Sequence, residues 1–232
     1  MFNKTSYCMN NRIHINGHEI RAIVFDWDGT LMDSAAAIVL CIQATAVDLG
    51  IEVPSDEQAR YVIGLGLMDA LIHAMPQLPQ SRYTEAADRY RFHFMKHSED
   101  LILFPGVMEM IGELETAGYS LAVATGKARR GLDRALAESG LTGRFHATRC
   151  ADECHSKPHP QMLLELMDEL DVPPEAILMI GDTTHDLLMG KNAGVNAVAV
   201  AYGAHKREVL EAESPIFCAE NVAQLRKWLA AD

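Results

Sequence analysis

The chain has 232 residues, of which 49% are hydrophobic and 22% charged, a composition that fits a soluble globular protein with one full domain and a smaller one. Its net charge of −12 disfavours nucleic acid and anionic membranes as partners, because their phosphates would be repelled. The five cysteines are odd in number and widely spread, which favours reduced thiols and a cytoplasmic setting.

The first segment, residues 1–20, carries charges, asparagines and histidines but no apolar core of a signal peptide. We expect it to be an N-terminal extension, either poorly structured or a short leading hairpin. No apolar run in the sequence reaches the roughly 18 residues that span a bilayer. A membrane-spanning protein is therefore not expected.

Beyond residue 20, short continuous apolar runs alternate with segments in which apolar residues recur at helical spacing. Such runs are typical of parallel strands that are buried on both faces of a sheet. The predicted strands are Ala22–Phe25, Ser120–Ala124, Phe145–Thr148, Ile177–Ile180 and Ala197–Ala201. The alternation predicts an α/β fold with a doubly wound parallel sheet.

One part of the chain breaks this alternation. Between the first two predicted strands lie roughly 70 residues with helical patterns and no strand, far more than a simple crossover needs. We therefore predict an inserted helical bundle over residues 34–103 and a main domain made of residues 21–33 and 104–232. The dipeptide Pro105-Gly106 marks the return to the main domain.

The first predicted strand ends in two acidic residues, Asp26 and Asp28, within the sequence AIVFDWDGTLMDS. Positions i and i+2 of an extended backbone point to the same side, so both carboxylates are expected at the carboxyl edge of the sheet, where doubly wound folds bind ligands. At an effective dielectric of about 20, two such charges about 4 Å apart repel by about 4 kcal/mol, and a divalent cation would reverse this balance. For a lone Asp-Gly, a simple turn would be the better interpretation.

The predicted strand Ile177–Ile180 also leads into acidic residues, because Gly181 and Asp182 follow it and Asp186 comes four residues later. If a helix begins near Thr183, Asp182 and Asp186 face the same edge of the sheet. Hard oxygen ligands of this kind suit Mg²⁺. The alternative for Asp186 is a favourable charge at a helix N-terminus, worth roughly a few tenths of a kcal/mol.

Two further positions offer groups that can bind a phosphoryl oxygen. Thr125 presents a hydroxyl at the end of a predicted strand, with flexible Gly126 after it. Lys157 lies in HSKPHP, where Pro158 keeps the preceding residue extended, and it can supply a point charge to phosphate. Taken singly, a strand-ending hydroxyl and a solvated loop lysine would be the better interpretations.

Together, these four segments resemble the haloacid dehalogenase superfamily in its phosphatase branch, and within it the phosphoglycolate phosphatases. The matching residues are Asp26 to Ser34 for the pattern DxDGTLxDS, Thr125, Lys157, and Gly181 to Asp186 for GDxxxD. Their order and approximate spacing agree with the family over nearly all of the chain.

The resemblance implies a Rossmann-like core with a mobile helical cap and a Mg²⁺-dependent phosphatase activity. Asp26 would attack phosphorus and form an aspartyl-phosphate, while Asp28 would protonate the leaving group and then activate water. Mg²⁺ would be held by Asp26, the backbone carbonyl of Asp28, and Asp182. Asp186 would join them directly or through water.

By the same resemblance, Thr125 and Lys157 would bind the transferring phosphoryl group. Gly126 departs from many relatives, which have Asn there, so contacts on the substrate side stay open. Arg129 begins the next helix and could reach an anionic substrate, although an exposed basic helix start is about equally plausible. The loop 64–66 could enter the site or be a plain turn. The expected partner is a small phosphorylated metabolite, and the expected assembly is a monomer or homodimer.

Two alternatives stay open beside this reading. A phosphomutase of the β-phosphoglucomutase kind shares the same core, and residues of the inserted bundle would decide between transfer to a sugar and transfer to water. A protein that binds phosphorylated ligands without catalysis could also use this scaffold. Cys150, Cys154, His155 and His159 suggest zinc, but their spacing is not that of a common zinc motif, and we expect them to be unliganded.

Overall fold

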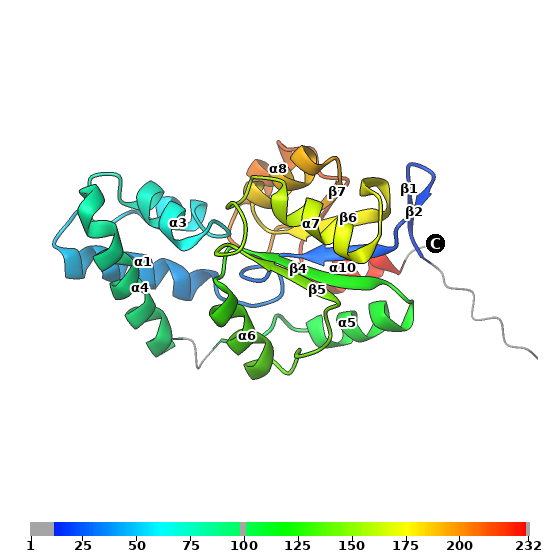
Figure 1. The fold of residues 1–232 in the computed structure, drawn as a ribbon, viewed down its shortest axis with the longest axis horizontal. Coiled ribbons are helices and arrows are strands. Elements are labelled where there is room, and N and C mark those ends of the chain that lie inside the picture. The colour runs from blue at the N-terminus through cyan, green and yellow to red at the C-terminus, as the bar shows by residue number, and fades with distance from the viewer. Residues whose placement is uncertain (1–11, 98–100, 231–232) are drawn as a thin grey trace, which may run out of the picture.

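The computed structural model describes residues 12–97 and 101–230 of the chain. Its main sheet has six strands: β3 (Ala22–Phe25), β4 (Ser120–Thr125), β5 (Ala147–Cys150), β6 (Ile177–Gly181), β7 (Asn196–Val200) and β8 (Phe217–Ala219). They are all parallel and lie in the order β5-β4-β3-β6-β7-β8 (Figure 1). The order reverses at β3, which pairs with β4 on one side and β6 on the other. The carboxyl ends at such a reversal are where doubly wound folds bind ligands.

Two layers of helices cover the sheet, one on each face (Figure 1). One face carries α5 (Val107–Thr116), α6 (Arg129–Glu138) and α10 (Val222–Leu229), and the other carries α7 (Gln161–Leu170), α8 (Thr184–Ala193) and the short α9 (Arg207–Glu211). Successive strand residues alternate between these layers, as the two-residue period of a strand requires. Ile23 and Phe25 pack toward α5, whereas Ala22 and Val24 pack toward α7. The predicted doubly wound α/β fold is therefore confirmed.

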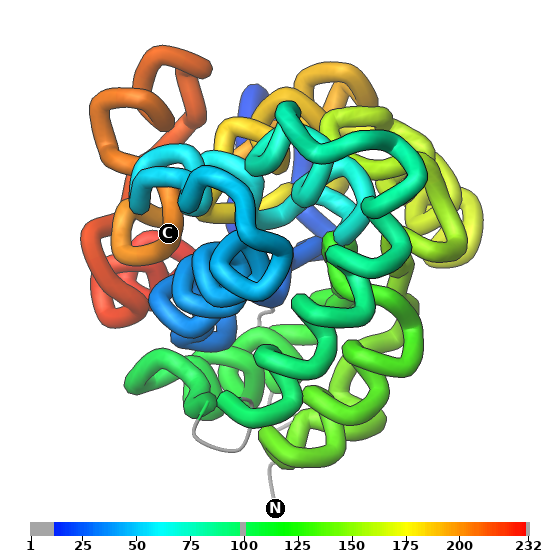
Figure 2. Tube along the Cα trace, turned by 90° about the vertical axis from the view of Figure 1, so that its left-hand side faces the viewer, coloured from blue at the N-terminus to red at the C-terminus, as the bar shows by residue number. Residues whose placement is uncertain are grey.

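The remaining helices form a separate bundle inserted after β3, at the left of Figure 1 and nearest the viewer in Figure 2. They are α1 (Ala35–Leu49), α2 (Asp56–Tyr61), α3 (Leu67–Ala74) and α4 (Tyr83–His97), with a 3-10 turn at Gln80–Arg82. The bundle has a hydrophobic core of its own, to which alanines on α1 and α4 contribute. Small alanine side chains let these two helices pack closely along their length. We refer to these helices as the cap.

The N-terminal segment contributes a small antiparallel hairpin, β1 (His14–Ile15) with β2 (His18–Glu19). It is attached to the main domain, because Ile13 N donates a hydrogen bond of 2.8 Å to the hydroxyl of Tyr119. Residues 1–11 of the predicted extension lie outside the described residues. Within the described part of the chain, no helix has the length and apolar character needed to cross a membrane.

Two of the predicted strands are shifted along the chain, one strand was missed, and β4 and β6 each extend one residue beyond the prediction. The prediction for β5 was wrong by two residues, because Phe145 owes its partial burial to edge-on packing against Trp27, with ring centroids 6.5 Å apart, and not to the sheet. The prediction for β7 was wrong by one residue at each end. The strand that was not predicted is β8, whose three residues complete the sheet beside β7.

Candidate active site

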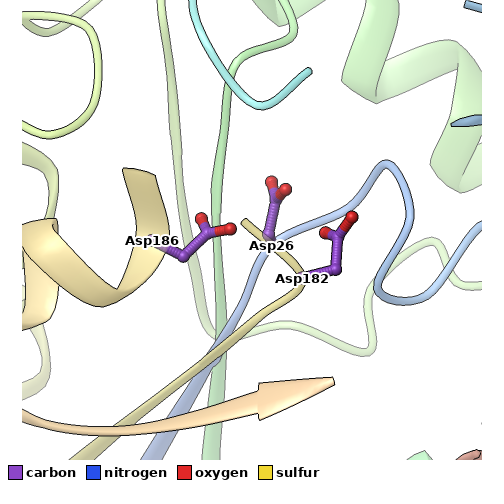
Figure 3. Close-up of side chains that lie close together, drawn as sticks. All are labelled: Asp26, Asp182 and Asp186. Atoms are coloured by element: carbon purple, nitrogen blue, oxygen red, sulfur yellow. The ribbon is translucent and has the colours of Figure 1, made fainter. Parts of the chain in front are cut away.

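Three aspartates converge at the carboxyl edge of the central strands. Asp26 follows β3, Asp182 follows β6, and Asp186 lies in the first turn of α8. Each offers one carboxylate oxygen, and these three oxygens lie within 4.8 Å of one another. Figure 3 shows Asp26 between the other two, with the carboxylate of Asp186 directed toward it. Because β3 and β6 pair in register and run in the same direction, the sheet itself brings Asp26 and Asp182 together.

The carboxylate of Asp26 is fully buried. Neither of its oxygens accepts a directed hydrogen bond from the described residues, although Lys157 Nζ lies 2.8 Å from Oδ1 as an ion pair. Burial raises the pKa of Asp26 to about 7; the charges of Asp186 and Asp28 add to this rise, and Lys157 opposes it. Oδ2 has neither a hydrogen bond nor an ion pair within the described residues, so it can bind a further cation or attack an electrophile.

Asp182 is held more firmly than Asp26. Its Oδ1 accepts a hydrogen bond of 2.8 Å from Thr30 Oγ1, and its Oδ2 accepts one of 2.7 Å from Ala204 N. Gly29 has a φ of +83°, and a Cβ at this position would overlap the Asp182 carboxylate. Burial, followed by the charges of Asp26 and Asp186, raises the pKa of Asp182 well above its ordinary range.

Asp186 has a structural role in addition to its place in this cluster. Its Oδ2 accepts hydrogen bonds from Thr183 N (3.1 Å) and Thr183 Oγ1 (2.7 Å), which form part of the capping box that begins α8. Its Oδ1 pairs with Lys157 Nζ at 2.7 Å. Lys157 thus joins Asp26 and Asp186. Although burial acts to lower the pKa of Lys157, the charges of Asp186 and Asp26 raise it above its ordinary value, so the ammonium stays charged.

Asp28 lies outside this three-carboxylate cluster and has its own partners. Its Oδ1 accepts a hydrogen bond of 2.6 Å from Ser34 Oγ, and its Oδ2 pairs with Lys127 Nζ at 3.0 Å. Thr125 ends β4 and is fully buried, and its Oγ1 accepts a hydrogen bond of 3.2 Å from Lys127 N. The sequence did not lead us to predict a role for Lys127. Its position two residues after the threonine that ends a strand could have indicated a cation near the site.

Gly126 lies under the cap loop formed by residues 64–66. A Cβ at position 126 would come within 2.6 Å of the Gly64 carbonyl oxygen and closer still to that of Leu65. The loop is also attached to the main domain, because Gly66 N donates a hydrogen bond of 2.9 Å to Ser156 Oγ. The glycine at position 126 therefore lets the cap backbone approach the strand that ends in Thr125.

Arg129 is not brought to the aspartate cluster by any contact that the structure shows. Its guanidinium binds both carboxylate oxygens of Glu153, at 2.9 and 2.8 Å, and donates to Thr148 Oγ1 at 2.8 Å. Hydrogen bonding to Glu153 raises the pKa of Arg129, although burial opposes the rise. These contacts fix the start of α6 onto β5.

Two histidines that the sequence analysis did not use lie beside the site. His185 Nε2 and His205 Nε2 both lie within hydrogen-bond distance of the carbonyl oxygen of Tyr61, at 2.7 and 3.2 Å. Tyr61 ends α2, so these contacts join the cap to the main domain. The positions of these histidines in the sequence do not predict the contact with Tyr61, because the contact depends on how the cap packs against the main domain.

The comparisons with known proteins agree with this geometry. A family model described as haloacid dehalogenase-like hydrolase matches residues 23–200. The probable phosphatase IndB of Dickeya dadantii is 37% identical over 199 residues, which cover 83% of this chain and 86% of that protein. Pyrophosphatase PpaX of Bacillus cereus is 31% identical over 209 residues, which cover 89% and 95%. The crystal structure of a predicted phosphoglycolate phosphatase from Haemophilus somnus has a TM-score of 0.79 at 25% identity and covers 90% of this chain and 97% of its own.

Proposed function

Because this chain belongs to the haloacid dehalogenase-like hydrolases, we propose that it is a Mg²⁺-dependent phosphatase that hydrolyses a small phosphorylated metabolite similar to phosphoglycolate. The observation that carries the proposal is the carboxylate of Asp26, which is buried among Asp182, Asp186 and Lys157 and has no directed hydrogen bond to either oxygen within the described residues. A nucleophile in such a position is free to attack once its charge is balanced.

The donor groups fit Mg²⁺, because they are hard carboxylate oxygens. Asp26 and Asp182 would bind it together with the backbone carbonyl of Asp28. Asp186 Oδ2 accepts two hydrogen bonds and its Oδ1 faces the Lys157 ammonium, whereas each oxygen of Asp182 accepts a single hydrogen bond and keeps a lone pair. This difference favours an indirect contact through water for Asp186. When bound, Mg²⁺ would neutralise charge on the carboxylates and on the phosphoryl group.

The chain's own residues would then carry out two proton-coupled steps. In the first, Asp26 attacks phosphorus while Asp28 gives a proton to the leaving oxygen, which produces an aspartyl-phosphate and an alcohol. In the second, Asp28 takes a proton from water as that water attacks the aspartyl-phosphate, which releases inorganic phosphate and restores Asp26. Thr125 and Lys157 would hold the phosphoryl oxygens throughout.

The closed cap supports a small substrate. Residues 64–66 lie against Gly126, and the side chains of Asp26 and Lys157 are shielded from solvent. Exclusion of bulk water strengthens the electrostatic contacts of the site. The proposed cap spans residues 34–103, the proposed location is the cytoplasm, and the proposed assembly is a monomer or homodimer. The two histidine contacts to Tyr61 support a cap that rests on the main domain at the end of α2.

The test is a panel of phosphate monoesters, including phosphoglycolate, together with pyrophosphate, assayed with Mg²⁺ and with EDTA. We expect turnover only with the metal, and we expect Asp26→Asn to abolish it while the protein stays folded. Asp168→Asn, on the exposed side of α7, is the matched control and should keep full activity. Retained turnover in Asp26→Asn would eliminate the covalent mechanism. Transfer of the phosphoryl group to a sugar phosphate would favour a mutase, and ligand binding without turnover would favour a non-catalytic role.

A further inference from the structure

We propose that Lys127 is a positioning residue that orients the carboxylate of Asp28 and that does so only when cap helix α4 is seated against it. This inference rests on the proposed function, since it concerns the group that exchanges protons with the leaving group and with water. It assigns a role to the loop between β4 and α6 that differs from binding of the transferring phosphoryl group.

The carboxylate of Asp28 is held by a donor on each of its oxygens. One carboxylate oxygen receives a hydrogen bond of 2.6 Å from Ser34 Oγ, and the other pairs with Lys127 Nζ at 3.0 Å. Two donors on two different oxygens fix the plane of a carboxylate, which a single donor leaves free to rotate. Removal of Lys127 would therefore leave Asp28 held on one side alone.

Lys127 is shielded from solvent and has a fixed backbone. The side chains of Lys127 and Asp28 are 12% and 10% exposed, so this pair is largely removed from water and its mutual attraction is little screened. The backbone of Lys127 is fixed as well, because its N–H donates to Thr125 Oγ1 and its carbonyl accepts from Ala151 N at 3.0 Å. The Lys127 side chain thus extends from an ordered backbone to the carboxylate of Asp28.

Lys127 also contacts the cap. Lys127 Nζ lies 4.7 Å from the centroid of the Phe94 ring, a distance suited to attraction between a cation and an aromatic face. Phe94 lies on α4 and stacks on Tyr90, with ring centroids 5.9 Å apart. The main domain supplies Lys127, whereas the cap supplies the ring. If the cap moved away, Phe94 would leave with it and Lys127 would be open to water.

A rival role for Lys127 is direct contact with the leaving group of the substrate. The lysine also lines a cavity of about 260 Å³ between α4 and α6, together with Trp27, Phe94 and Arg134. A substrate contact would be lost mainly as binding, whereas a positioning contact would be lost mainly as rate. The two roles therefore predict different changes in KM and kcat.

The experiment measures steady-state kinetics of Lys127→Met, Phe94→Leu and the double variant with phosphoglycolate, or with the alkyl phosphate that the wild-type enzyme cleaves fastest. General acid–base catalysis contributes roughly 100-fold to 10,000-fold, so loss of orientation should lower kcat by roughly 10-fold to 100-fold in Lys127→Met, with KM changed by less than about 3-fold. Lys127→Arg should recover part of the rate. Phe94→Leu should lower kcat by about 3-fold alone and should have no further effect in the Lys127→Met background.

A second substrate separates orientation of Asp28 from general damage. The leaving group of 4-nitrophenyl phosphate needs little protonation, so its kcat/KM should fall by less than about 3-fold in Lys127→Met. Lys96→Met is the matched control: Lys96 Nζ lies 4.1 Å from the Phe92 ring on the same helix α4, on the exposed side, and its loss should leave both substrates unchanged.

Three outcomes would overturn the inference. They are a rise in KM with unchanged kcat, an equal loss for both substrates, and additive effects of the two substitutions. If Lys127→Met fails to fold, Phe94→Leu and Lys127→Arg replace it, because both variants keep a cation at position 127. Their rates with the two substrates still show whether the loss depends on the leaving group. A wild-type enzyme that cleaves no phosphate ester would instead defeat the proposed function, whereas an active wild type with an equally active Lys127→Met defeats this inference alone.

Discussion

The metal-free protein should lose stability as the pH rises, because of Asp26. Burial raises the pKa of this carboxyl from 3.8 to about 7 in the folded state, and the charges of Asp186 and Asp28 add to the rise while Lys157 opposes it. A group with a higher pKa in the folded state than in the unfolded state binds more protons when folded. The free energy of unfolding therefore falls as the pH rises from the unfolded pKa toward the folded pKa.

The size of this effect follows from the two pKa values. One pKa unit corresponds to about 1.4 kcal/mol, so a rise of about three units is worth about 4 kcal/mol across the whole range. Integrated over the titration, about 2–3 kcal/mol of this falls between pH 5 and pH 7.5. For a chain of this length, that corresponds to a change in Tm of roughly 5–10 °C.

The assay is urea unfolding at pH 5 and pH 7.5 in EDTA, with wild-type protein and Asp26→Asn compared at each pH. The comparison cancels titrating groups that do not interact with Asp26, such as Glu115, whose pKa is lowered by its hydrogen bond to Arg144. The stability of the variant relative to wild type should grow by about 2–3 kcal/mol between the two values of pH. Mg²⁺ should then stabilise the wild type more than the variant. An equal difference at both values of pH would refute the idea that the buried charge of Asp26 is costly.

Three further predictions follow from the same contacts. Lys157→Met should destabilise the protein by about 3–5 kcal/mol in urea unfolding, because two buried carboxylates lose their cation, whereas the exposed control Lys191→Met should change little. Gly126→Ala should lower kcat/KM by at least about 10-fold with little change in Tm, because its Cβ displaces the cap loop; near-wild-type kinetics would contradict this. Asp182→Asn should abolish the rise in Tm that Mg²⁺ gives the wild type, and a retained rise in thermal scans would remove Asp182 from the metal site.

The main features of the site could be predicted because they depend on strand ends. The apolar runs before Asp26 and Asp182 identify two strands, and parallel strands carry the residues that follow them to one edge of the sheet. Thr125 follows the same rule at the end of β4. Lys157 needed the resemblance to a known family, because a lysine in a loop gives no local signal for a buried ion pair.

The features that could not be predicted depend on packing between distant segments. The three residues of β8 are too few to show a period, and they form a strand because β7 offers them an open edge. The pairing of Lys127 with Asp28 joins two loops that lie almost 100 residues apart in sequence, and no spacing rule reports it. Arg129 was predicted as a substrate ligand from its position alone, but Glu153 offers it a bidentate partner that the sequence did not reveal.

The charges around the cluster also bear on which ion it could hold. Burial lowers the pKa of both His185 and His205, so both are neutral near pH 7. His205 Nδ1 accepts a hydrogen bond of 3.1 Å from Thr184 N, which leaves the proton on Nε2, directed at the carbonyl oxygen of Tyr61. These imidazoles therefore hold the cap without adding positive charge to the site.

Within the described part of the chain, the cation that pairs with members of the aspartate cluster is Lys157, which contacts Asp26 and Asp186. Because the pKa values of Asp26 and Asp182 are raised, a metal ion must displace protons from them; the three ionised carboxylates and one ammonium then have a net charge of −2. One divalent ion balances this charge, whereas a monovalent ion would leave Asp26 facing an anionic phosphate ester without full compensation. A positively charged imidazole beside Asp182 or Asp186 would weaken the attraction of the cluster for a divalent ion. The neutral state of His185 and His205 is therefore compatible with a Mg²⁺ site.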